Sequence, residues 1–426
     1  MTRRKESSSF VSKPAPRAVL VAPRLNTPND VLLAELTSLL EGLGMSVLRT
    51  LSQKHTPLDS PHLLGKGKLE EVKQVISEMS NDAETELVVV VASEVTPAEQ
   101  RMLERTWGVR VLDRTAVILR VFEQRAQTRL ARLEVELARL TYELPRIRDD
   151  QSLGDREGGG GRGGRGHSNV ELAKQRARKA IAEVRKRIDD EQATLRQQRQ
   201  RRSHVPHAAL VGYTNAGKSS LMRALTGSDV LVEDKLFATL GTTVRAISGA
   251  SPRVLLSDTV GFLRELPHGL VQSFRSTLET SLDAGLLVHV VDASDAELTS
   301  QIEVTRRALE EVGGGALPTL LVFCKVDQVS SERKAELEEA FPTGLFVCTF
   351  DDEDVARLRE EIVSFFEKEM IETTICVPFG DGKRLAELRS VGRVVRESTV
   401  DTGVVVTLRV APHALKDFVA PRAASS

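Results

Sequence analysis

The stretch GYTNAGKSS, residues 212–220, carries the clearest chemistry, because it matches the phosphate-binding pattern G-x-x-x-x-G-K-S. Gly212 and Gly217 permit a tight loop whose backbone N–H groups face phosphates. Lys218 can reach the β- and γ-phosphates, and the Ser219 hydroxyl can ligate Mg²⁺. An apolar strand precedes the loop and a helix follows it, a context in which chance matches are rare. The stretch therefore predicts a site for a nucleotide's phosphates.

A second motif, DTVG at residues 258–261, follows the loop after about 40 residues. The pattern D-x-x-G is weak alone, but this distance, with room for one hairpin between, strengthens it. Asp258 ends an apolar strand, where it can hold the water shell of Mg²⁺, and the Gly261 N–H can reach a γ-phosphate. Between the two motifs, LFATLGTTV offers Thr239, Thr242 and Thr243 as a threonine that closes on magnesium when the γ-phosphate is present.

A third motif, LLVFCKVD at residues 320–327, would read the base. The Asp327 carboxylate could accept hydrogen bonds from N1–H and N2–H₂ of guanine, and adenine has no such pair of donors. K-x-D alone would fit a solvated strand end, but its place after the two phosphate motifs favours guanine.

Residues 18–122 alternate β-like runs with helical stretches, the pattern of a small parallel α/β domain. The basic, serine-rich residues 1–17 before it are expected to be a disordered tail, and a mitochondrial presequence is less favoured. Within the domain, LLGKGKLEEVKQVI places two glycines and two lysines before a helix, where they could bind an anion. An ordinary strand-to-helix turn is the favoured interpretation.

The middle of the chain has a helical leucine pattern that predicts an antiparallel hairpin over residues 123–202. Apolar residues follow steps of three and four along both predicted helices: Leu130, Leu133, Leu137, Leu140 and Leu144, then Ala177, Ile181, Val184 and Ile188. Pro145 helps to end the first helix, and the second is expected to begin near Asn169. Helices of about 25 residues each would make an arm about 40 Å long.

The tip of this hairpin, residues 157–166, contains seven glycines together with Arg162 and Arg165. Such a segment cannot bury a core, so it is either a passive linker or a contact that becomes ordered on binding. Arginine pairs with phosphate, and glycine permits close approach, so RNA is the favoured partner of the two arginines. Residues 101–202 carry a net charge of +10, which fits either a nucleic-acid surface or a solvated face.

The composition excludes several classes of protein. A chain of 426 residues is too long for one ordinary domain, and its apolar runs are too short to span a membrane. The three cysteines, Cys324, Cys348 and Cys376, are single and far apart, which predicts neither a zinc site nor a disulfide framework. They suit a reducing compartment, and a cytoplasmic location is expected, with peripheral association with ribosomes or a membrane left open and a mitochondrial or plastid matrix less favoured.

Taken together, several stretches resemble the HflX family of ribosome-associated GTPases. They are GKGKLEE, DRTAVIL, QRAQTRLARLEVELARL, GYTNAGKSSL, LFATLGTT and DTVGFLRELPHGLVQSFRSTLE, and the resemblance runs from about residue 18 to the C-terminal region. It implies an α/β fold with an N-terminal α/β domain and a long helical hairpin. A doubly wound G domain over residues 203–369 and a small α+β domain over residues 370–426 would follow.

The resemblance implies a Mg²⁺-dependent GTPase that binds the large ribosomal subunit and its rRNA in the GTP form. It would separate stalled or idle ribosomes and hydrolyse GTP to leave, acting as a monomer. Catalysis would rest on Lys218, Thr239 and Gly261, and magnesium on Ser219 and Thr239. The residues expected to contact GTP or GDP are Gly212, Tyr213, Thr214, Asn215, Ala216, Gly217, Lys218, Ser219, Ser220, Phe237, Ala238, Thr239, Leu240, Gly241, Asp258, Thr259, Val260, Gly261, Cys324, Lys325, Val326, Asp327, Cys348 and Thr349.

Two other functions stay open at this point. An RNA-binding module with impaired GTP cycling is one, and a signalling switch with a protein partner is the other. The intact Lys218, Ser219, Asp258 and Asp327 argue against the first. The arginines at the glycine-rich tip argue against the second.

The chain also departs from the family pattern. Cys324 stands where asparagine is usual, and a thiol cannot replace the amide's donor and acceptor, so nucleotide should be held less tightly. Cys348 and Thr349 replace a usual Ser-Ala pair, and GRGHSNVE replaces GPGETQLE at the hairpin tip. Phe262 stands where signalling GTPases have a glutamine that orients water, so intrinsic hydrolysis should be slow and completed by the ribosome.

Overall fold

The computed structural model describes residues 16–23, 29–53, 63–79, 86–147, 165–200, 205–227, 237, 243–259, 261–263, 270, 283–368 and 370–412. The chain divides into two compact units. The first unit comprises residues 1–124 and 143–156, and the second comprises residues 125–142 and 157–426.

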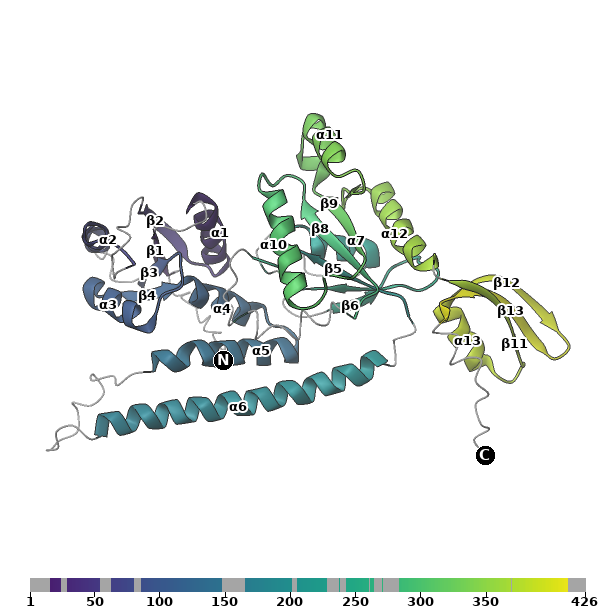
Figure 1. Ribbon diagram of the computed structural model, residues 1–426, viewed down its shortest axis with the longest axis horizontal. Coiled ribbons are helices and arrows are strands. Elements are labelled where there is room, and N and C mark those ends of the chain that lie inside the picture. Colours follow the sequence, from purple (N-terminus) through teal and green to yellow (C-terminus); the bar gives the residue numbers. More distant parts are fainter. Residues whose placement is uncertain are drawn as a thin grey trace, which may run out of the picture. The chain divides into compact units, whose positions relative to one another are not determined.

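The first unit is built on a four-stranded parallel sheet with the strand order β2-β1-β3-β4 (Figure 1). Its elements are β1 (Arg17–Ala22), α1 (Asn29–Gly42), β2 (Ser46–Ser52), α2 (Lys66–Met79), β3 (Leu87–Val91), α3 (Pro97–Trp107), β4 (Arg110–Asp113) and α4 (Arg114–Arg125). Strand β3 is the continuous apolar run LVVVV and is buried along almost its whole length. Such runs are typical of parallel strands whose two faces are both covered. The predicted parallel α/β domain is confirmed.

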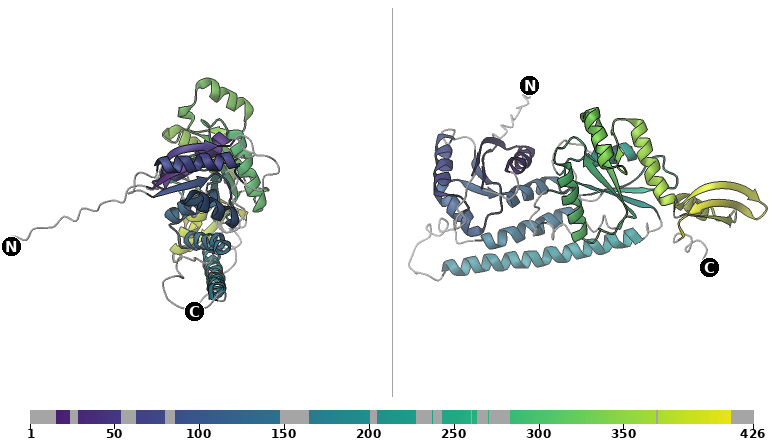
Figure 2. Two further views of the ribbon diagram at one scale, coloured as in Figure 1. Left: turned by 90° about the vertical axis from the view of Figure 1, so that its left-hand side faces the viewer. Right: turned by 45° about the horizontal axis from the view of Figure 1, so that its top comes forward.

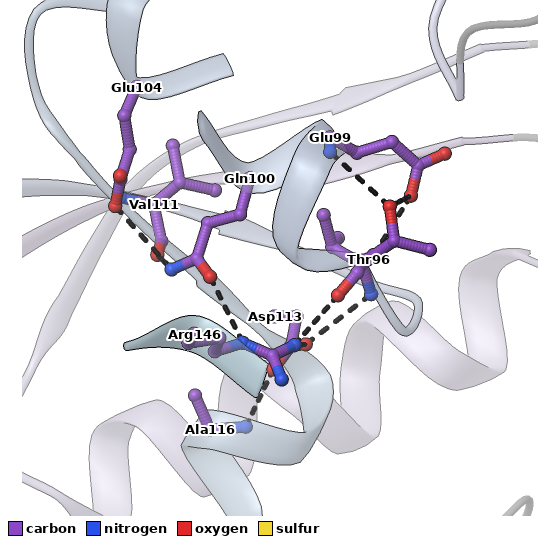
Figure 3. A network of polar contacts seen from close by, with 9 residues as sticks. Thr96, Glu99, Gln100, Glu104, Val111, Asp113, Ala116 and Arg146 are labelled. Atoms are coloured by element: carbon purple, nitrogen blue, oxygen red, sulfur yellow. Dashed lines mark hydrogen bonds and ion pairs between the residues drawn. The ribbon is translucent and has the colours of Figure 1, made fainter. Parts of the chain in front are cut away.

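An ion pair between Asp113 and Arg146 lies at the carboxyl edge of this sheet (Figure 3). Asp113 ends β4, is 3% exposed, and accepts hydrogen bonds from the N–H groups of Ala116 and Val95. Arg146, in the 3-10 turn η1 (Leu144–Arg146), donates to Asp113 Oδ2 at 3.0 Å and to the Val95 carbonyl at 2.7 Å. The turn η1 is therefore held at the sheet edge by the hydrogen bonds and the ion pair of Arg146.

In the second unit, helices α5 (Arg129–Glu143) and α6 (Arg165–Gln200) lie side by side (Figure 2). Their shared seam contains Leu130, Leu133, Val184 and Ile188. Ion pairs join Arg129 to Glu191 and Glu136 to Arg187, so the two helices run antiparallel.

The predicted equal helix lengths are wrong. Helix α5 has 15 residues and α6 has 36, or roughly 22 and 54 Å, and α6 begins at Arg165 instead of near Asn169. The first helix is short because α4 ends at Arg125 and Thr128 starts a new helix, its hydroxyl accepting from the Ala131 N–H.

The same unit contains a six-stranded sheet with the order β10-β9-β8-β5-β7-β6, in which only β6 is antiparallel to its neighbour among the described strands. Its elements are β5 (His207–Gly212), α7 (Lys218–Thr226), β6 (Thr243–Ala246), β7 (Leu255–Asp258), β8 (Leu286–Asp292), α10 (Leu298–Glu311), β9 (Thr319–Cys324), η2 (Val326–Gln328), α11 (Ser331–Ala340), β10 (Leu345–Phe346) and α12 (Asp352–Glu367). Apolar residues of α7 and α12 form a core with one face of the sheet, and those of α10 and α11 pack with β8, β9 and β10 in a second cluster. This arrangement is the predicted doubly wound domain.

The C-terminal part is a three-stranded antiparallel sheet with the order β11-β13-β12 and one helix along it (Figure 1). Its elements are β11 (Ile371–Val377), α13 (Gly382–Val391), β12 (Gly392–Val400) and β13 (Gly403–Val410). Leu388 of α13 packs against Val406 and Leu408 of the central strand. The expected small α+β fold is confirmed. No helix of the described segments is both long and apolar enough to cross a bilayer.

Candidate functional site

The phosphate loop joins the end of β5 to the start of α7, at the carboxyl edge of the six-stranded sheet. Gly212 and Gly217 both have positive φ angles, 147° and 99°. A Cβ at Gly212 would clash with the Val290 carbonyl oxygen of the neighbouring strand β8. Only glycine fits there, so the loop can turn tightly and expose backbone N–H groups, as phosphate binding requires.

Lys218 is buried inside this loop, with 6% of its surface exposed. Its ammonium group donates to the Tyr213 carbonyl at 2.6 Å and to the Gly212 carbonyl at 3.1 Å. Burial lowers the pKa of Lys218 from 10.5 to about 8, although the Asp258 carboxylate partly opposes the shift. The charged form of Lys218 would be stabilised if an anion replaced these neutral carbonyl acceptors.

Ser219 and Asp258 meet at the same edge, where the Ser219 hydroxyl donates to Asp258 Oδ2 at 3.1 Å. The other carboxylate oxygen of Asp258 accepts from the Thr259 N–H at 2.9 Å. The Thr259 hydroxyl in turn donates to the Leu210 carbonyl in β5 at 2.7 Å. These bonds hold the end of β7 beside the phosphate loop.

This oxygen pair also fits a magnesium ion, which prefers hard oxygen ligands and few protein side chains. Among the described ranges, no cluster of three or more His, Cys, Asp or Glu side chains could hold a metal ion by itself. The donor set at this edge, one hydroxyl and one carboxylate, suits an ion that is shared with a nucleotide's phosphates.

Gly261 lies directly against the phosphate loop. A Cβ at this position would come within 2.8 Å of both Cα and Cγ2 of Thr214 and 3.0 Å from Lys218 Nζ. The next residue, Phe262, pairs with the loop through its backbone: its N–H donates to the Gly212 carbonyl, and its carbonyl accepts from the Thr214 N–H. The Phe262 side chain is 2% exposed. It packs in the protein interior and offers no group that could orient water.

The base-reading motif follows β9. Lys325 has a left-handed backbone, with φ of 59°, and Asp327 lies exposed in the short helix η2. The Lys325 ammonium pairs with Asp292 Oδ2 at 2.7 Å, and Asp292 ends the neighbouring strand β8. Sequence reasoning missed Asp292, although a carboxylate that ends an apolar strand, as Asp258 does, was a usable signal.

Cys324 is buried beneath the phosphate loop and belongs to the same apolar core as Ala216. A Cβ at Gly217 would lie 3.3 Å from the Cys324 Cβ and 3.8 Å from its sulfur. Burial raises the pKa of the Cys324 thiol to about 12, so the thiol is neutral. The base loop and the phosphate loop therefore meet here through van der Waals contact.

Cys348 lies beside Asp327. Burial raises the pKa of the Cys348 thiol, and the charge of the nearby Asp327 carboxylate adds to the rise, whereas backbone hydrogen bonds from Phe350 and Asp351 oppose it. The Cys348 N–H donates to Asp354 at 2.8 Å, and Thr349 is half-buried next to it. Cys348 therefore lies near the carboxylate that is expected to read guanine.

The remaining predicted residues divide into those that the structure describes and those that it does not. In the phosphate loop, Tyr213 and Ala216 are buried, and Asn215 is exposed with a φ of 61°. Ser220 in α7 and Val326 in η2 are half-buried, whereas Phe237 is buried.

Most of the predicted residues between the phosphate loop and the D-x-x-G motif, and those at the hairpin tip, lie outside the described ranges. The predicted residues that lie outside the described ranges are Arg162, Ala238, Thr239, Leu240, Gly241, Thr242 and Val260, and the same holds for the side chain of Arg165. Thr243, the third switch candidate, is paired with Asp258 through the β6–β7 ladder.

Three family models match the chain. One described as "GTP-binding GTPase N-terminal" matches residues 30–123, and one described as "GTP-binding GTPase Middle Region" matches residues 125–202. A third, described as "50S ribosome-binding GTPase", matches residues 207–325, which contain the two phosphate motifs and most of the base-reading motif.

Curated relatives match over nearly the whole chain. A GTPase HflX from Gluconacetobacter diazotrophicus is 41% identical, covering 94% of this chain and 97% of that protein. A GTPase HflX from Caldanaerobacter subterraneus is 35% identical, covering 92% of this chain and 91% of that protein. Among solved structures, a GTP-binding protein from Sulfolobus solfataricus in complex with GDP aligns with 82% of this chain and 99% of its own, at 22% identity and a TM-score of 0.45.

Proposed function

Because the chain belongs to the HflX family of GTPases, we propose that it uses GTP binding and hydrolysis to control its attachment to the large ribosomal subunit. The observation that carries this proposal is the convergence of Lys218, Ser219, Asp258 and Gly261 at one edge of the sheet. The segment that contains them also matches the family model described as a 50S ribosome-binding GTPase.

In the GTP form, Lys218 exchanges its two carbonyl acceptors for the β- and γ-phosphates, a stronger charge-assisted contact. Gly261 lies against the phosphate loop near Lys218, and its N–H would donate to the γ-phosphate. Ser219 and Thr239 would hold magnesium, with Asp258 holding its water shell, and the ion would neutralise charge on the phosphates.

The base is read at the other end of the site. Asp327, which lies exposed at the end of the base-reading motif, accepts from the two donors of guanine. Lys325 is held by Asp292, so its aliphatic stem is fixed beside the base. Adenine offers no matching donors, which makes the site selective for guanine nucleotides.

Intrinsic hydrolysis is slow in this proposal, because Phe262 is buried and its side chain cannot position the attacking water. The large subunit completes the site by positioning the segments around Thr239 and Gly261 or by supplying a positive group. Hydrolysis then releases the protein from the ribosome, and a monomer is sufficient for the cycle.

The hairpin is the proposed rRNA contact. On α6, Arg176, Lys179 and Lys186 follow steps of three and seven residues, so they share one face of the helix, which also carries the exposed Glu183 and Asp190. That face is turned away from the seam formed by Val184 and Ile188, and all three cations are exposed. Together with Arg162 and Arg165 at the tip, they suit a phosphate backbone.

The test is GTP turnover measured alone, with small subunits and with large subunits. We expect the large subunit to stimulate turnover about 100-fold or more, and the small subunit to have little effect. GTP binding without stimulation would favour a signalling switch with a protein partner. Ribosome binding that is the same with GTP, GDP or no nucleotide would favour an RNA-binding module.

The proposal extends to separation of stalled or idle ribosomes into subunits, in a reducing, cytoplasmic setting that suits the free cysteines. Sedimentation of intact ribosomes after incubation with the protein and a non-hydrolysable GTP analogue tests this step. An unchanged fraction of intact ribosomes would limit the function to binding the large subunit.

A further inference from the structure

Thr214, the third residue of the phosphate loop, has a buried side chain whose methyl group packs against the protein but whose hydroxyl makes no hydrogen bond to the described residues. It is 4% exposed, and its backbone N–H donates to the Phe262 carbonyl at 2.8 Å. Its hydroxyl oxygen is buried and has no hydrogen-bond partner among the described residues. A buried hydroxyl without a partner destabilises a fold. Its presence is explained either by a ligand that bonds to it or by a requirement of the packing.

Packing does not supply that reason. The Thr214 Cγ2 methyl group and Cα face Gly261, where a Cβ would come within 2.8 Å of both. Valine has nearly the same shape as threonine and would make the same contact through its methyl group. The methyl group therefore explains the packing, and the hydroxyl is left over.

The position of Thr214 indicates which ligand would use the hydroxyl. Thr214 and Lys218 Nζ both lie within contact distance of the same point beside Gly261. Lys218 and the glycine of D-x-x-G are the groups expected at the γ-phosphate end of the nucleotide. A phosphate oxygen is an acceptor, and a threonine hydroxyl can donate to it.

We propose that the Thr214 hydroxyl donates a hydrogen bond to the terminal phosphate of GTP and so helps the loop to distinguish GTP from GDP. The inference rests on the proposed function of this site as a GTP site. It gives the loop a side-chain contact with the γ-phosphate that Phe262, being buried, cannot make.

The test compares Thr214→Val, which removes only the hydroxyl, with Thr214→Ser, which keeps it. Affinities for GDP and for a non-hydrolysable GTP analogue are measured by competition with a fluorescent guanine nucleotide. We expect Thr214→Val to weaken analogue binding about 10- to 150-fold while GDP affinity changes less than about twofold. Thr214→Ser should bind both nucleotides nearly as the parent protein does.

Thermal unfolding of the nucleotide-free proteins gives a second readout. Thr214→Val should unfold at the same temperature as the parent or higher, because it removes a buried hydroxyl without a partner among the described residues. Thr214→Ala provides a second variant without the hydroxyl and should show the same selective loss of analogue binding.

Equal analogue affinity in Thr214→Val and the parent protein would overturn the inference. Parallel losses of GDP and analogue binding would overturn it too, since they would indicate a structural role. Failure of the parent protein itself to bind the analogue would instead contradict the proposed function of the whole site.

Discussion

The phosphate end and the base end of the nucleotide site are built in different ways. At the phosphate end, charged and polar groups meet: Lys218 donates to a carbonyl of its own loop, and the hydrogen bond from Ser219 to Asp258 joins the phosphate loop to the end of β7. At the base end, the contact with the phosphate loop is apolar, because Cys324 packs against Gly217. We therefore expect the site to bind the phosphates strongly and the base weakly.

Such a division has a functional consequence. Affinity would come mainly from phosphates and magnesium, and the base end would supply selectivity through Asp327 without slowing release. A factor with fast release can reload from free GTP without an exchange protein.

The largest expected effect is at the phosphate end. Lys218→Ala and Ser219→Ala should each weaken binding of GTP with Mg²⁺ by at least about 100-fold, because each removes a charge-assisted or metal contact. Lys179→Ala on α6, which removes an exposed lysine of the hairpin, is the control and should bind GTP normally. Near-normal affinity in both loop variants, measured by calorimetry, would remove the loop from the site.

The next effect concerns selectivity at the base end. Asp327→Asn turns one acceptor into a donor and should lower the preference for GTP over XTP by about 100-fold or more. Competition between the two nucleotides measures this ratio directly. Asp352→Asn, which changes an exposed carboxylate in the first turn of α12, is the control and should keep the preference for guanine. An unaltered ratio in Asp327→Asn would mean that another group reads the base.

The third effect tests the apolar contact between Cys324 and the phosphate loop. Cys324→Asn should tighten both GTP and GDP by roughly 2- to 150-fold, mainly through slower release, because it can add one or two hydrogen bonds of about 0.5 to 1.5 kcal/mol each. Cys324→Ala adds none and should release nucleotide as fast as the parent. Stopped-flow release of a fluorescent guanine nucleotide is the measurement. Equal off-rates for Cys324→Asn and the parent would show that the cysteine does not speed nucleotide release.

The smallest effect separates the two ends by their response to pH. Burial lowers the pKa of Lys218 to about 8, against 10.5 in an unfolded chain, so the unfolded chain binds more protons between these values. Stability therefore rises with pH through this window, and we expect about 1 kcal/mol between pH 7 and 9 from this group. Cys324 acts oppositely above pH 9, since its thiol keeps its proton in the folded state up to about pH 12.

Urea unfolding of the nucleotide-free protein at pH 7 and pH 9 tests this prediction. Lys218→Met should lose the rise in stability, whereas Lys179→Met should keep it. The same rise in both variants would assign the pH dependence to other groups.

The sequence could predict the motifs of the phosphate end because they are local. Gly212, Gly217, Lys218 and Ser219 lie within eight residues, and a strand before them and a helix after them fix how they are presented. The same is true of the parallel domain around β3, whose continuous apolar run indicates burial on both faces. Local spacing and hydrophobic pattern carry this information.

The lengths of the two hairpin helices could not be predicted in the same way. The helical stretch expected from residue 123 onward is interrupted before α5, where Thr128 caps a new helix, so the periodicity alone overstates the first arm. Element boundaries depend on such capping bonds, because a capped new helix and an uninterrupted helix differ little in free energy.

The amino-acid sequence by itself determined the chemistry that this chain carries: a phosphate loop, a D-x-x-G motif, a carboxylate that is expected to read guanine and the α/β pattern that presents them. The tertiary structure decided which of these groups touch. Contact between Thr214 and Gly261, between Cys324 and Gly217, and between Asp292 and Lys325 joins residues that are 33 to 107 positions apart. The parallel strands β9, β8, β5 and β7 bring them together at one edge of the sheet, and that pairing depends on the packing of the whole domain.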